Sequence, residues 1–423
     1  MTKPQPSPSP THAASAARPG AVMFIFITVL LDVMALGMVV PVLPSLVRHF
    51  VEGNTSQAAV IYGLFNAVFA LVQFFCSPVL GGLSDRFGRR PLILASNLGL
   101  GLSYALMAWA PNVLWLFVGR VVSGVTSASF ATASAYICDV TELDKRPGAF
   151  AILGAAYGAG FVFGPAIGGM LGDFDPRLPL YVAAAFSLAN AVYGWLVLPE
   201  SLPKPLRLDF SWRRANPVGS LVLLRRHPEL FGLAGVSFIS TLAQVSLPST
   251  IVLYAQYRYG WTLKTLGVTL TLVGVALVFA QAVIVGRFIK RFGNRRSMIA
   301  GLGFGALGFL IAGLASTGDI LWWGIPVLAL WGIFGAAAQT VMSKHVSGGE
   351  QGQLQGATAS LTGIAELIGP MIFPFVFAYF VRPGVPMVYS GAPFILASVL
   401  LVLGGVWAWW VTRPEVDPLA SED

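Results

Sequence analysis

The chain has 423 residues, 56% of them apolar and only 10% charged, and its formal net charge is +8. So little charge excludes an ordinary soluble domain and indicates a protein of the membrane. A positive balance is also typical of nucleic-acid binding, but the placement of the basic residues gives it a different origin, described below. Cys76 and Cys138 are too few for a disulfide framework, and the four histidines are scattered without metal-ligand spacing. We therefore expect no metal site and no cofactor.

Residues 1–20 are rich in Pro, Ser and Ala. This composition is typical of a disordered tail, because it offers little apolar surface to bury. Only two basic residues, Lys3 and Arg18, precede the next apolar run, and that run is long enough to span a membrane. These features argue against a cleaved signal peptide. We expect residues 1–20 to form a disordered cytoplasmic tail.

Twelve apolar segments of roughly spanning length follow. A helix needs about 20 apolar residues to cross a bilayer, and backbone groups in lipid must be hydrogen-bonded internally, so we expect helices rather than strands. The segments are approximately 22–47, 58–80, 92–110, 113–138, 148–171, 179–199, 229–253, 264–288, 297–316, 320–343, 357–380 and 387–411. We therefore expect an all-α membrane protein of 12 transmembrane helices. Its expected parts are an N-terminal six-helix bundle (21–200), a cytoplasmic central loop (201–228), a C-terminal six-helix bundle (229–412) and a cytoplasmic tail (413–423).

The two halves carry matching sequences. Arg86-Phe87-Gly88 recurs as Arg291-Phe292-Gly293, and Gly164-Pro165 recurs as Gly369-Pro370, both at an offset of 205 positions. One match can arise by chance in a chain rich in Gly and Pro, but two at the same offset indicate a duplicated half. Such a duplication in an apolar chain is a common plan of secondary transporters.

Basic residues favour one side of the membrane. With the N-terminus inside, the inner segments carry twenty of the 26 Lys and Arg residues, the outer loops carry five, and Arg120 lies within a span. This bias predicts that both termini are cytoplasmic, in a multi-pass protein of the inner membrane. It also accounts for the positive net charge without a nucleic-acid partner, since contact with lipid headgroups is the simplest role for most of these residues.

Three charged residues, Asp32, Arg120 and Glu366, lie well inside predicted spans. A charge at mid-membrane costs about 2.5–3.5 kcal/mol on insertion scales, so each is a functional candidate by default. A carboxyl group in apolar surroundings can gain and lose a proton near neutral pH, which makes Asp32 and Glu366 the expected proton-coupling residues. The alternative is a structural ion pair between helices, and for Arg120 the two interpretations are equally supported.

Four predicted helices carry a stripe of polar side chains at helical spacing. The stripes are Tyr62, Asn66 and Gln73 on the second span; Arg120, Ser123, Gly124, Ser127 and Ser134 on the fourth; Ser237, Thr241 and Gln244 on the seventh; and Thr358, Thr362 and Glu366 on the eleventh. A polar stripe faces a water-filled path or another helix rather than lipid. Hydrogen bonding between helices explains any single stripe equally well. Four stripes from both halves favour a central substrate cavity, to which we add Gln281 of the eighth span.

Several motifs resemble those of a known transporter family. The segment Gly81-x-Leu83-Ser84-Asp85-Arg86-x-Gly88-Arg89-Arg90 looks like the cytoplasmic loop signature of the major facilitator superfamily. The segment Gly160-x-x-x-Gly164-Pro165-x-x-Gly168-Gly169 looks like that superfamily's antiporter motif, which marks drug–proton exporters. On structure alone, these glycines allow close helix contact and Pro165 bends the helix.

Further stretches resemble the tetracycline efflux proteins, so the likeness covers nearly the whole chain beyond residue 20. They are Leu31-Asp32 with Gly37 and Pro41–Pro44, Gly119-Arg120 with Ser123-Gly124, and Gln351–Gly356. The resemblance implies that Asp85 and Arg86 belong to a charge network at the cytoplasmic junction of the halves, with Asp139 as partner. Gly81, Gly88, Arg89 and Arg90 would belong to the same conformational gate. Asp32 and Arg120 would lie in the N-terminal half of the cavity.

The chain also departs from those exporters. They carry an aspartate in the third helix, where this chain has Ser103, and another in the ninth, where it has the acid-free stretch 301–308. Their eighth-helix histidine has no equivalent near Gln281. Metal-bound tetracycline is a cation that uses such acids, so these departures argue against tetracycline itself as the substrate. Glu366 is an additional acid that can take over coupling or cation binding.

These observations predict proton-coupled efflux of an amphipathic drug-like small molecule by alternating access of two bundles. We expect a monomer in the lipid bilayer. The chain has no G-x-x-x-x-G-K-[ST] loop, which favours the proton gradient over ATP as the energy source. The alternative is a symporter that takes up a small metabolite, because the same fold serves both directions. An enzyme or a receptor is disfavoured, because we find neither a nucleophile–base pair nor a substantial soluble domain.

Overall fold

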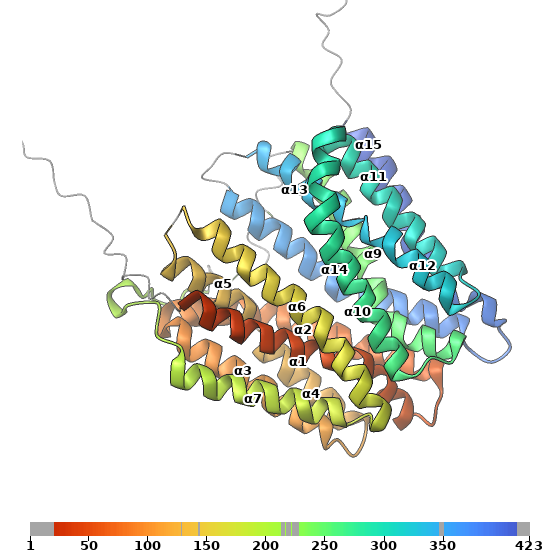
Figure 1. Cartoon of the computed structure of the whole chain (residues 1–423), viewed down its shortest axis with the longest axis horizontal. Coiled ribbons are helices and arrows are strands. Elements are labelled where there is room, and N and C mark those ends of the chain that lie inside the picture. Colours follow the sequence, from red (N-terminus) through yellow and green to blue (C-terminus); the bar gives the residue numbers. More distant parts are fainter. Residues whose placement is uncertain are drawn as a thin grey trace, which may run out of the picture.

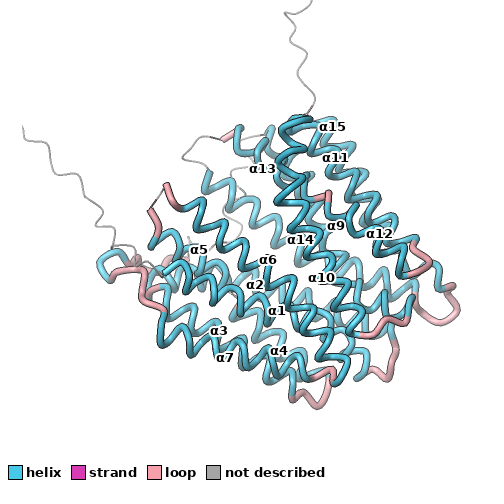
Figure 2. The backbone as a smooth tube through the Cα atoms, viewed as in Figure 1, coloured by secondary structure: helices cyan, strands magenta, loops and turns pink. Residues whose placement is uncertain are grey.

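The computed structural model describes residues 21–127, 129–142, 144–212, 216, 221, 228–346 and 351–412. The predicted tails 1–20 and 413–423 lie outside the described residues, as do 213–215, 217–220 and 222–227 of the central loop, so those predictions stay open. Within the described part, the chain forms helices joined by short loops, without strands (Figure 2). The expected all-helical fold is confirmed.

The first half contains six membrane crossings, because its apolar runs satisfy their backbone groups as helices. Capping residues fix where some of these helices begin. For example, the Asn54 side chain accepts a hydrogen bond from the backbone N–H of Gln57 at 3.0 Å. The helices are α1 (Ala21–Phe50), α2 (Thr55–Phe87), α3 (Arg89–Ala108), α4 (Val113–Thr126), α5 (Ser129–Val140), α6 (Arg146–Phe174) and α7 (Leu178–Val197). The fourth crossing is divided between α4 and α5. A short 3-10 turn, η1 (Lys204–Leu206), follows α7.

The second half repeats this plan. Its helices are α9 (Pro228–Tyr259), α10 (Leu263–Phe279), the π-helical segment η3 (Ala280–Val285), α11 (Gly286–Leu314), α12 (Gly318–Ala329), α13 (Gly332–Lys344), α14 (Gln351–Phe380), η5 (Met387–Gly391) and α15 (Ala392–Val411). The tenth crossing is divided between α12 and α13, as the fourth is divided in the first half.

Eleven helical stretches in the described residues are long and apolar enough to cross a membrane. One of them, Leu263–Leu314, has 52 residues. At about 1.5 Å per residue it is more than twice as long as the roughly 30 Å hydrocarbon core, so it must cross twice. The backbone at Gly293 is non-helical (φ 75°, ψ 163°), which divides this stretch into two crossings. The twelve predicted crossings are therefore present.

The break at Gly293 has a counterpart in the first half. Gly88, between α2 and α3, has φ 107° and ψ 160°. Both glycines are in a region of positive φ that side chains disfavour. They are 205 residues apart, the same offset that relates Gly164-Pro165 of α6 to Gly369-Pro370 of α14. The duplicated sequence thus folds into two bundles with the same backbone break at the same position.

The bundles lie side by side at one end and spread apart at the other (Figure 1). They meet mainly through two pairs of helices, α6 with α10 and α2 with α14. We call the end at which α2 ends and α3 begins the basic end, since it carries Arg86, Arg89 and Arg90. The turns 51–54 and 260–262 mark the opposite end. In Figure 1 the halves meet at the lower right, toward the opposite end, and α5 is well separated from α13 toward the basic end.

Hydrogen bonds between the halves lie toward the opposite end. The Gln256 side-chain amide donates to the Ser45 hydroxyl at 2.7 Å, and the Ser56 hydroxyl donates to the Ala378 carbonyl at 2.8 Å. Each of these residues is close to a turn at that end. The structure is therefore a conformation closed at the opposite end.

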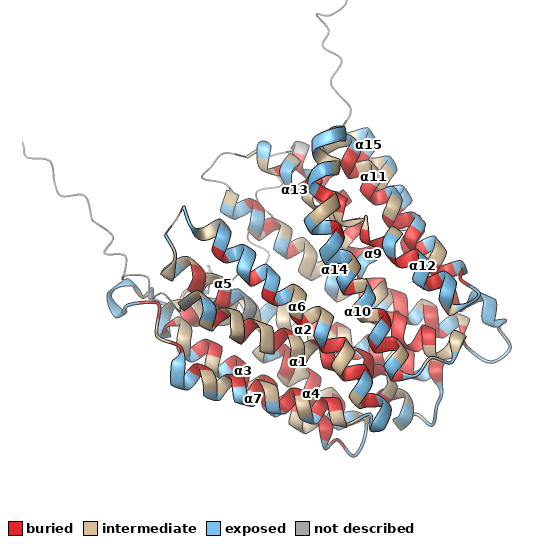
Figure 3. Ribbon diagram, viewed as in Figure 1, coloured by how far each residue is buried: buried red, intermediate tan, exposed pale blue. Residues whose placement is uncertain are grey.

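Large apolar side chains remain exposed along the outer helix faces, for example Leu64, Leu71 and Phe75 on one side of α2. In Figure 3, exposed residues recur along the outside of the bundles. This pattern is expected where hydrocarbon, rather than water, surrounds the protein, and it identifies the chain as a multi-pass membrane protein.

Candidate transport site

The polar stripe of α2 faces the space between the halves. On this helix Gly63 packs against α14, and Val72 packs against α4. With 3.6 residues per turn, the stripe lies between those two contact faces. It consists of Tyr62, Asn66 and Gln73. The Tyr62 hydroxyl lies 3.5 Å from a backbone carbonyl oxygen of α9, which places it at the boundary between the halves.

The stripe of α9 faces the first half. That carbonyl belongs to Pro248, and Ser237, Thr241 and Gln244 lie on the same face of the helix at spacings of eleven, seven and four residues. Gln244 is exposed although it lies in the middle of an apolar helix. A polar side chain exposed in this direction lines the space between the halves rather than the lipid.

On α14, the faces that pack against neighbouring helices show which way Glu366 points. Gly363 packs against α2, and Gly369 packs against α9. Glu366 lies between these two contact faces and is exposed, and Thr362 precedes it by about one turn. The carboxylate therefore faces the space between the halves.

Tyr157 of α6 was not predicted, and it faces the same space. Gly158 packs against α10 and Gly164 against α1, and Tyr157 lies between these directions and is 41% exposed. It also interacts electrostatically with Glu366 of the other half. The available signal in the sequence was a hydroxyl-bearing aromatic residue within a helix of small residues.

Two further candidates lie in irregular helical segments. Gln281 is exposed, next to Gly332 of α13, in the π-helical segment η3. Such segments often occur at functional sites, because they turn side chains out of the regular helical register. Ser127 ends α4 and donates to the Gly124 carbonyl at 3.1 Å. Its hydroxyl therefore satisfies a helix end.

Arg120 is buried between α4 and α2 with 7% of its surface exposed. Its terminal nitrogen donates to the Asn66 side-chain oxygen at 2.9 Å, and its guanidinium lies 4.3 Å from the centre of the Phe69 ring. Both partners come from α2, and neither is negatively charged. Among the described residues no carboxylate is within ion-pair distance of Arg120. Arg120 is therefore not one partner of a structural ion pair here.

Asp32 occupies a different position from the expected one. It is 8% exposed, and its carboxylate accepts a hydrogen bond from the Asn190 amide at 2.8 Å. The Asn97 amide, oriented to donate, is 3.0 Å from the other carboxylate oxygen. These amides belong to α7 and α3, so Asp32 faces the core of the first half. The face of α1 that contains Gly37 packs against α6 instead.

Ser103 and Gly301, at two of the places where the chain departs from the tetracycline exporters, are closely packed. The Ser103 and Ser123 hydroxyls are 2.8 Å apart and join α3 to α4. A Cβ on Gly301 of α11 would lie 2.5 Å from the Phe334 backbone nitrogen, which leaves no room for an acidic side chain. Within the described residues, no cluster of three or more His, Cys, Asp and Glu side chains has the arrangement of a metal site.

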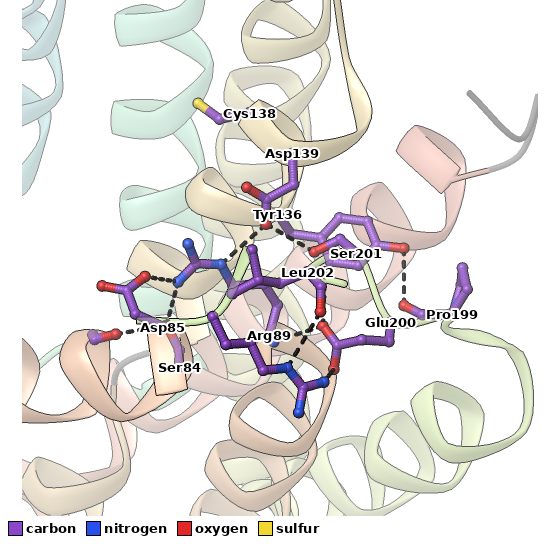
Figure 4. Close-up of polar contacts among 12 residues, drawn as sticks. Ser84, Asp85, Arg89, Tyr136, Cys138, Asp139, Pro199, Glu200, Ser201 and Leu202 are labelled. Atoms are coloured by element: carbon purple, nitrogen blue, oxygen red, sulfur yellow. Dashed lines mark hydrogen bonds and ion pairs between the residues drawn. The ribbon is translucent and has the colours of Figure 1, made fainter. Parts of the chain in front are cut away.

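At the basic end, Arg89 joins two carboxylates (Figure 4). Its guanidinium is 2.5 Å from Asp85 and 3.1 Å from Asp139. Arg89 thus has the role in the network that the motif predicted for Arg86. Arg86 is exposed, stacks on the neighbouring Phe87 ring at 5.4 Å, and has no ion pair within the described part of the chain. All three members of the network belong to the first half, so it braces that half rather than linking the halves in this conformation.

Glu200, just after α7, extends the network and was not predicted. Its carboxylate accepts from the backbone amides of Arg89 at 2.8 Å and Leu202 at 3.0 Å. A Cβ on Gly88 would lie 2.2 Å from that carboxylate, so the glycine permits this close approach. Ser201 donates to the Asp139 carboxylate at 3.0 Å. The start of the central loop is thus fastened to the gate residues, while Gly81 has open space around it and Arg90 donates to the Trp195 carbonyl.

The glycines of the expected antiporter motif form two different contacts. Gly160, Gly164 and Gly168 face α1, where added Cβ atoms would lie 2.4–2.8 Å from atoms of α1. Gly169 faces α10 of the other half, and an added Cβ would lie 2.4 Å from a backbone oxygen there. The carbonyl of Pro165 also approaches α10 closely. The motif therefore packs α6 within its own half and across the boundary at the same time.

Comparisons with known proteins agree with this architecture. The profile of the Major Facilitator Superfamily matches residues 25–370. The chain is 39% identical over 362 residues to the class C tetracycline resistance protein of Escherichia coli, covering 85% of this chain and 90% of that protein. It is 31% identical to the class H protein of Pasteurella multocida over 93% and 96% of the two chains. A bacterial homologue of the human lysosomal transporter Spinster, solved inward-facing and unoccupied, has the same fold, with a TM-score of 0.75 and 15% identity over 94% of this chain and 98% of that one.

Proposed function

Because the chain belongs to the major facilitator superfamily, we propose that it exports an amphipathic, drug-like small molecule across the bacterial inner membrane in exchange for protons. The family expected from the motifs is confirmed. The observation that carries the proposal is the similarity to tetracycline resistance proteins over 85% or more of this chain. The close contacts of the 160–169 glycines with α1 and α10 support it, because the resemblance associates that motif with antiporters.

We assign the basic end to the cytoplasm, since an excess of Lys and Arg marks cytoplasmic loops. Both termini then lie inside the cell. In this orientation the conformation closed by the Ser56–Ala378 and Gln256–Ser45 hydrogen bonds is the one that receives substrate from the cytoplasm. Release requires the opposite end to separate and the basic end to close.

We assign the substrate to the space between the halves. The set is Tyr62, Asn66, Gln73, Arg120, Ser127, Gln244, Gln281 and Thr362, to which Tyr157 is added. Exposed aromatic and amide side chains supply the apolar walls and the few polar contacts typical of small-molecule sites. The site draws on helices of both halves, so substrate binding can influence how the halves move relative to one another.

We assign proton coupling to Asp32 and Glu366, in two different ways. Glu366 faces the site, so a proton and a basic group of the substrate can compete for the same carboxylate. Asp32 is enclosed by amides and acts at a distance. The charges of both Asp32 and Arg120 act on Tyr104, which lies between them in this electrostatic sense. The protonation of Asp32 can therefore influence Arg120, the charge that we assign to the substrate site.

The experiment is a drug-susceptibility panel in a pump-deleted bacterial host, followed by transport in proteoliposomes under an imposed pH gradient. We expect expression to raise resistance to several amphipathic drugs and Asp32→Asn to abolish that resistance at equal expression. Release of protons on addition of substrate identifies exchange. Accumulation of labelled substrate by energised cells would instead identify uptake and refute the proposal.

A further inference from the structure

Two charges without a charged partner lie at the space between the halves: Glu366 faces it, and Arg120 is hydrogen-bonded to Asn66 of the α2 stripe that faces it. Arg120 belongs to the first half, is more than nine-tenths buried, and has a buried Nε atom with no hydrogen-bond partner. Glu366 belongs to the second half, and no cation is within ion-pair distance of it among the described residues. Burying a charge such as that of Arg120 is unfavourable unless an opposite charge or hydrogen bonds compensate for it, whereas Glu366 is exposed and accessible to a ligand.

The two charges lie at the same depth. Where α2 crosses α14, Gly63 packs against Pro370 and Phe74 packs against Gly363. Because the helices run in opposite directions, the midpoint between these contacts is near residue 69 on α2 and near Glu366 on α14. Phe69 is the ring on which the Arg120 guanidinium stacks. A ligand between the halves at this depth can reach both charges.

The protein groups around these two charges indicate which chemical groups such a ligand carries. Phe69 and Tyr157 present aromatic rings, and Asn66 presents an amide. A guanidinium prefers a planar acidic group that can accept two hydrogen bonds, such as a carboxylate or an enolate. A carboxylate prefers a protonated amine. The third membrane charge, Asp32, is already occupied by the amides of Asn190 and Asn97.

We propose that the substrate is amphoteric, with an acidic group that binds Arg120 and a basic amine that binds Glu366. The inference rests on the proposed function and specifies its substrate class. Since the two site charges are of opposite sign, a ligand with both groups satisfies both, whereas a simple cation leaves Arg120 unpaired. An amphoteric ligand also joins the two halves through charge, which favours closure of the site around it.

The first test asks which charge type the exported drugs have. The susceptibility panel should contain amphoteric compounds, permanent cations and simple acids of similar size. We expect resistance to be concentrated among the amphoteric members. Export confined to permanent cations or to simple acids would support the proposed function and overturn this inference. If no compound of any class is exported, the proposed function fails and the inference fails with it.

The second test uses one aromatic scaffold in three charge forms. Ciprofloxacin is amphoteric, its methyl ester retains only the amine, and its N-acetyl derivative retains only the carboxylate. We expect purified wild-type protein in nanodiscs to bind the amphoteric form roughly tenfold or more tightly than either derivative. Equal binding of the amphoteric form and the ester by the wild type would overturn the inference.

Substitutions then assign each group of the ligand to its partner. Arg120→Gln keeps a donor for Asn66, and it should remove the preference for ciprofloxacin over the ester. Glu366→Gln should remove the preference over the N-acetyl derivative. Because Glu366 is exposed, this second variant remains informative if Arg120→Gln does not fold. An equal weakening of all three ligands in both variants would indicate a structural role for the two charges and refute the assignment.

Discussion

Gly169 of α6 offers a way to shift the balance between the two access states. A Cβ at this position would lie 2.4 Å from the Leu263 carbonyl oxygen and 2.7 Å from the Gly267 Cα, both on α10. Both neighbouring atoms are backbone, so neither can rotate away, and the helices have to separate. Overpacking by one methyl group costs about 1–3 kcal/mol. Gly169→Ala should therefore weaken the contact between the halves toward the opposite end.

This cost falls on one state only, because the contact crosses the boundary between the halves and is lost when the opposite end opens. A change of 1.4 kcal/mol is about tenfold in an equilibrium constant, so the closed state should lose roughly 5–150-fold in population relative to the open one. Gly168→Ala places its Cβ 2.4 Å from the Met38 carbonyl oxygen within the same half. It should lower the thermal stability of both states without changing their ratio. Gly154→Ala, on the same helix with nothing within 4 Å of the added Cβ, is the matched control.

The assay is oxidative crosslinking between Ser45→Cys and Gln256→Cys, which replace side chains 2.7 Å apart at the opposite end. Cys76→Ser and Cys138→Ser remove the native thiols. We expect the crosslinking rate to fall in the Gly169→Ala background, to stay unchanged with Gly154→Ala, and to change little with Gly168→Ala at temperatures where that protein is folded. A crosslinking rate in Gly169→Ala equal to that of the control would refute the assignment of Gly169 to the boundary that closes.

Three further predictions concern charge. Asp85→Asn removes the ion pair with Arg89, which is worth roughly 1 kcal/mol, so we expect about a fivefold loss of efflux at normal expression. Glu142→Gln is the control, because it breaks only an exposed pair and should leave efflux unchanged. Arg120→Lys keeps the charge but loses the planar fork, so substrate affinity should fall about tenfold; full activity in a transport assay would favour a purely electrostatic role. Asp32→Asn should abolish uphill, pH-driven transport while downhill equilibration continues; uphill pumping by both Asp32→Asn and Glu366→Gln in proteoliposomes would exclude both acids from coupling.

The membrane crossings were predictable because the bilayer leaves the backbone few alternatives. An apolar run of spanning length has to be helical, and the duplicated motifs related the two halves before their shapes were known. Irregularities within crossings carried no comparable signal. The divided fourth and tenth crossings and the π-helical segment η3 depend on packing between helices, and composition does not report that packing. The break at Gly293 was predictable, because it lies in the basic stretch between the expected spans 264–288 and 297–316 and matches its repeat partner Gly88.

Helical spacing identified which polar residues share a face but not which neighbour that face meets. The α2, α9 and α14 stripes turned toward the space between the halves. Asp32 did not, because the side of α1 that contacts α6 is determined by glycines such as Gly37 and Gly164. Arg86 and Arg89 are three residues apart in one basic stretch, and the chain turns between them at Gly88, so that Arg89 is the one that reaches both acids. Tyr157 and Glu200 were missed because neither is a charge within a span.

The separation of the two membrane acids has a consequence for coupling. A single carboxylate that binds both substrate and proton enforces exchange only for substrates that carry a basic group. Asp32, held by Asn97 and Asn190 away from the site, cannot compete with substrate directly. Its protonation can still change the charge balance around Tyr104 and Arg120, whichever substrate is bound. Loss of Glu366 should therefore abolish exchange selectively for basic substrates, whereas loss of Asp32 should abolish it for all, and transport of one amphoteric and one acidic probe by each variant distinguishes the two roles.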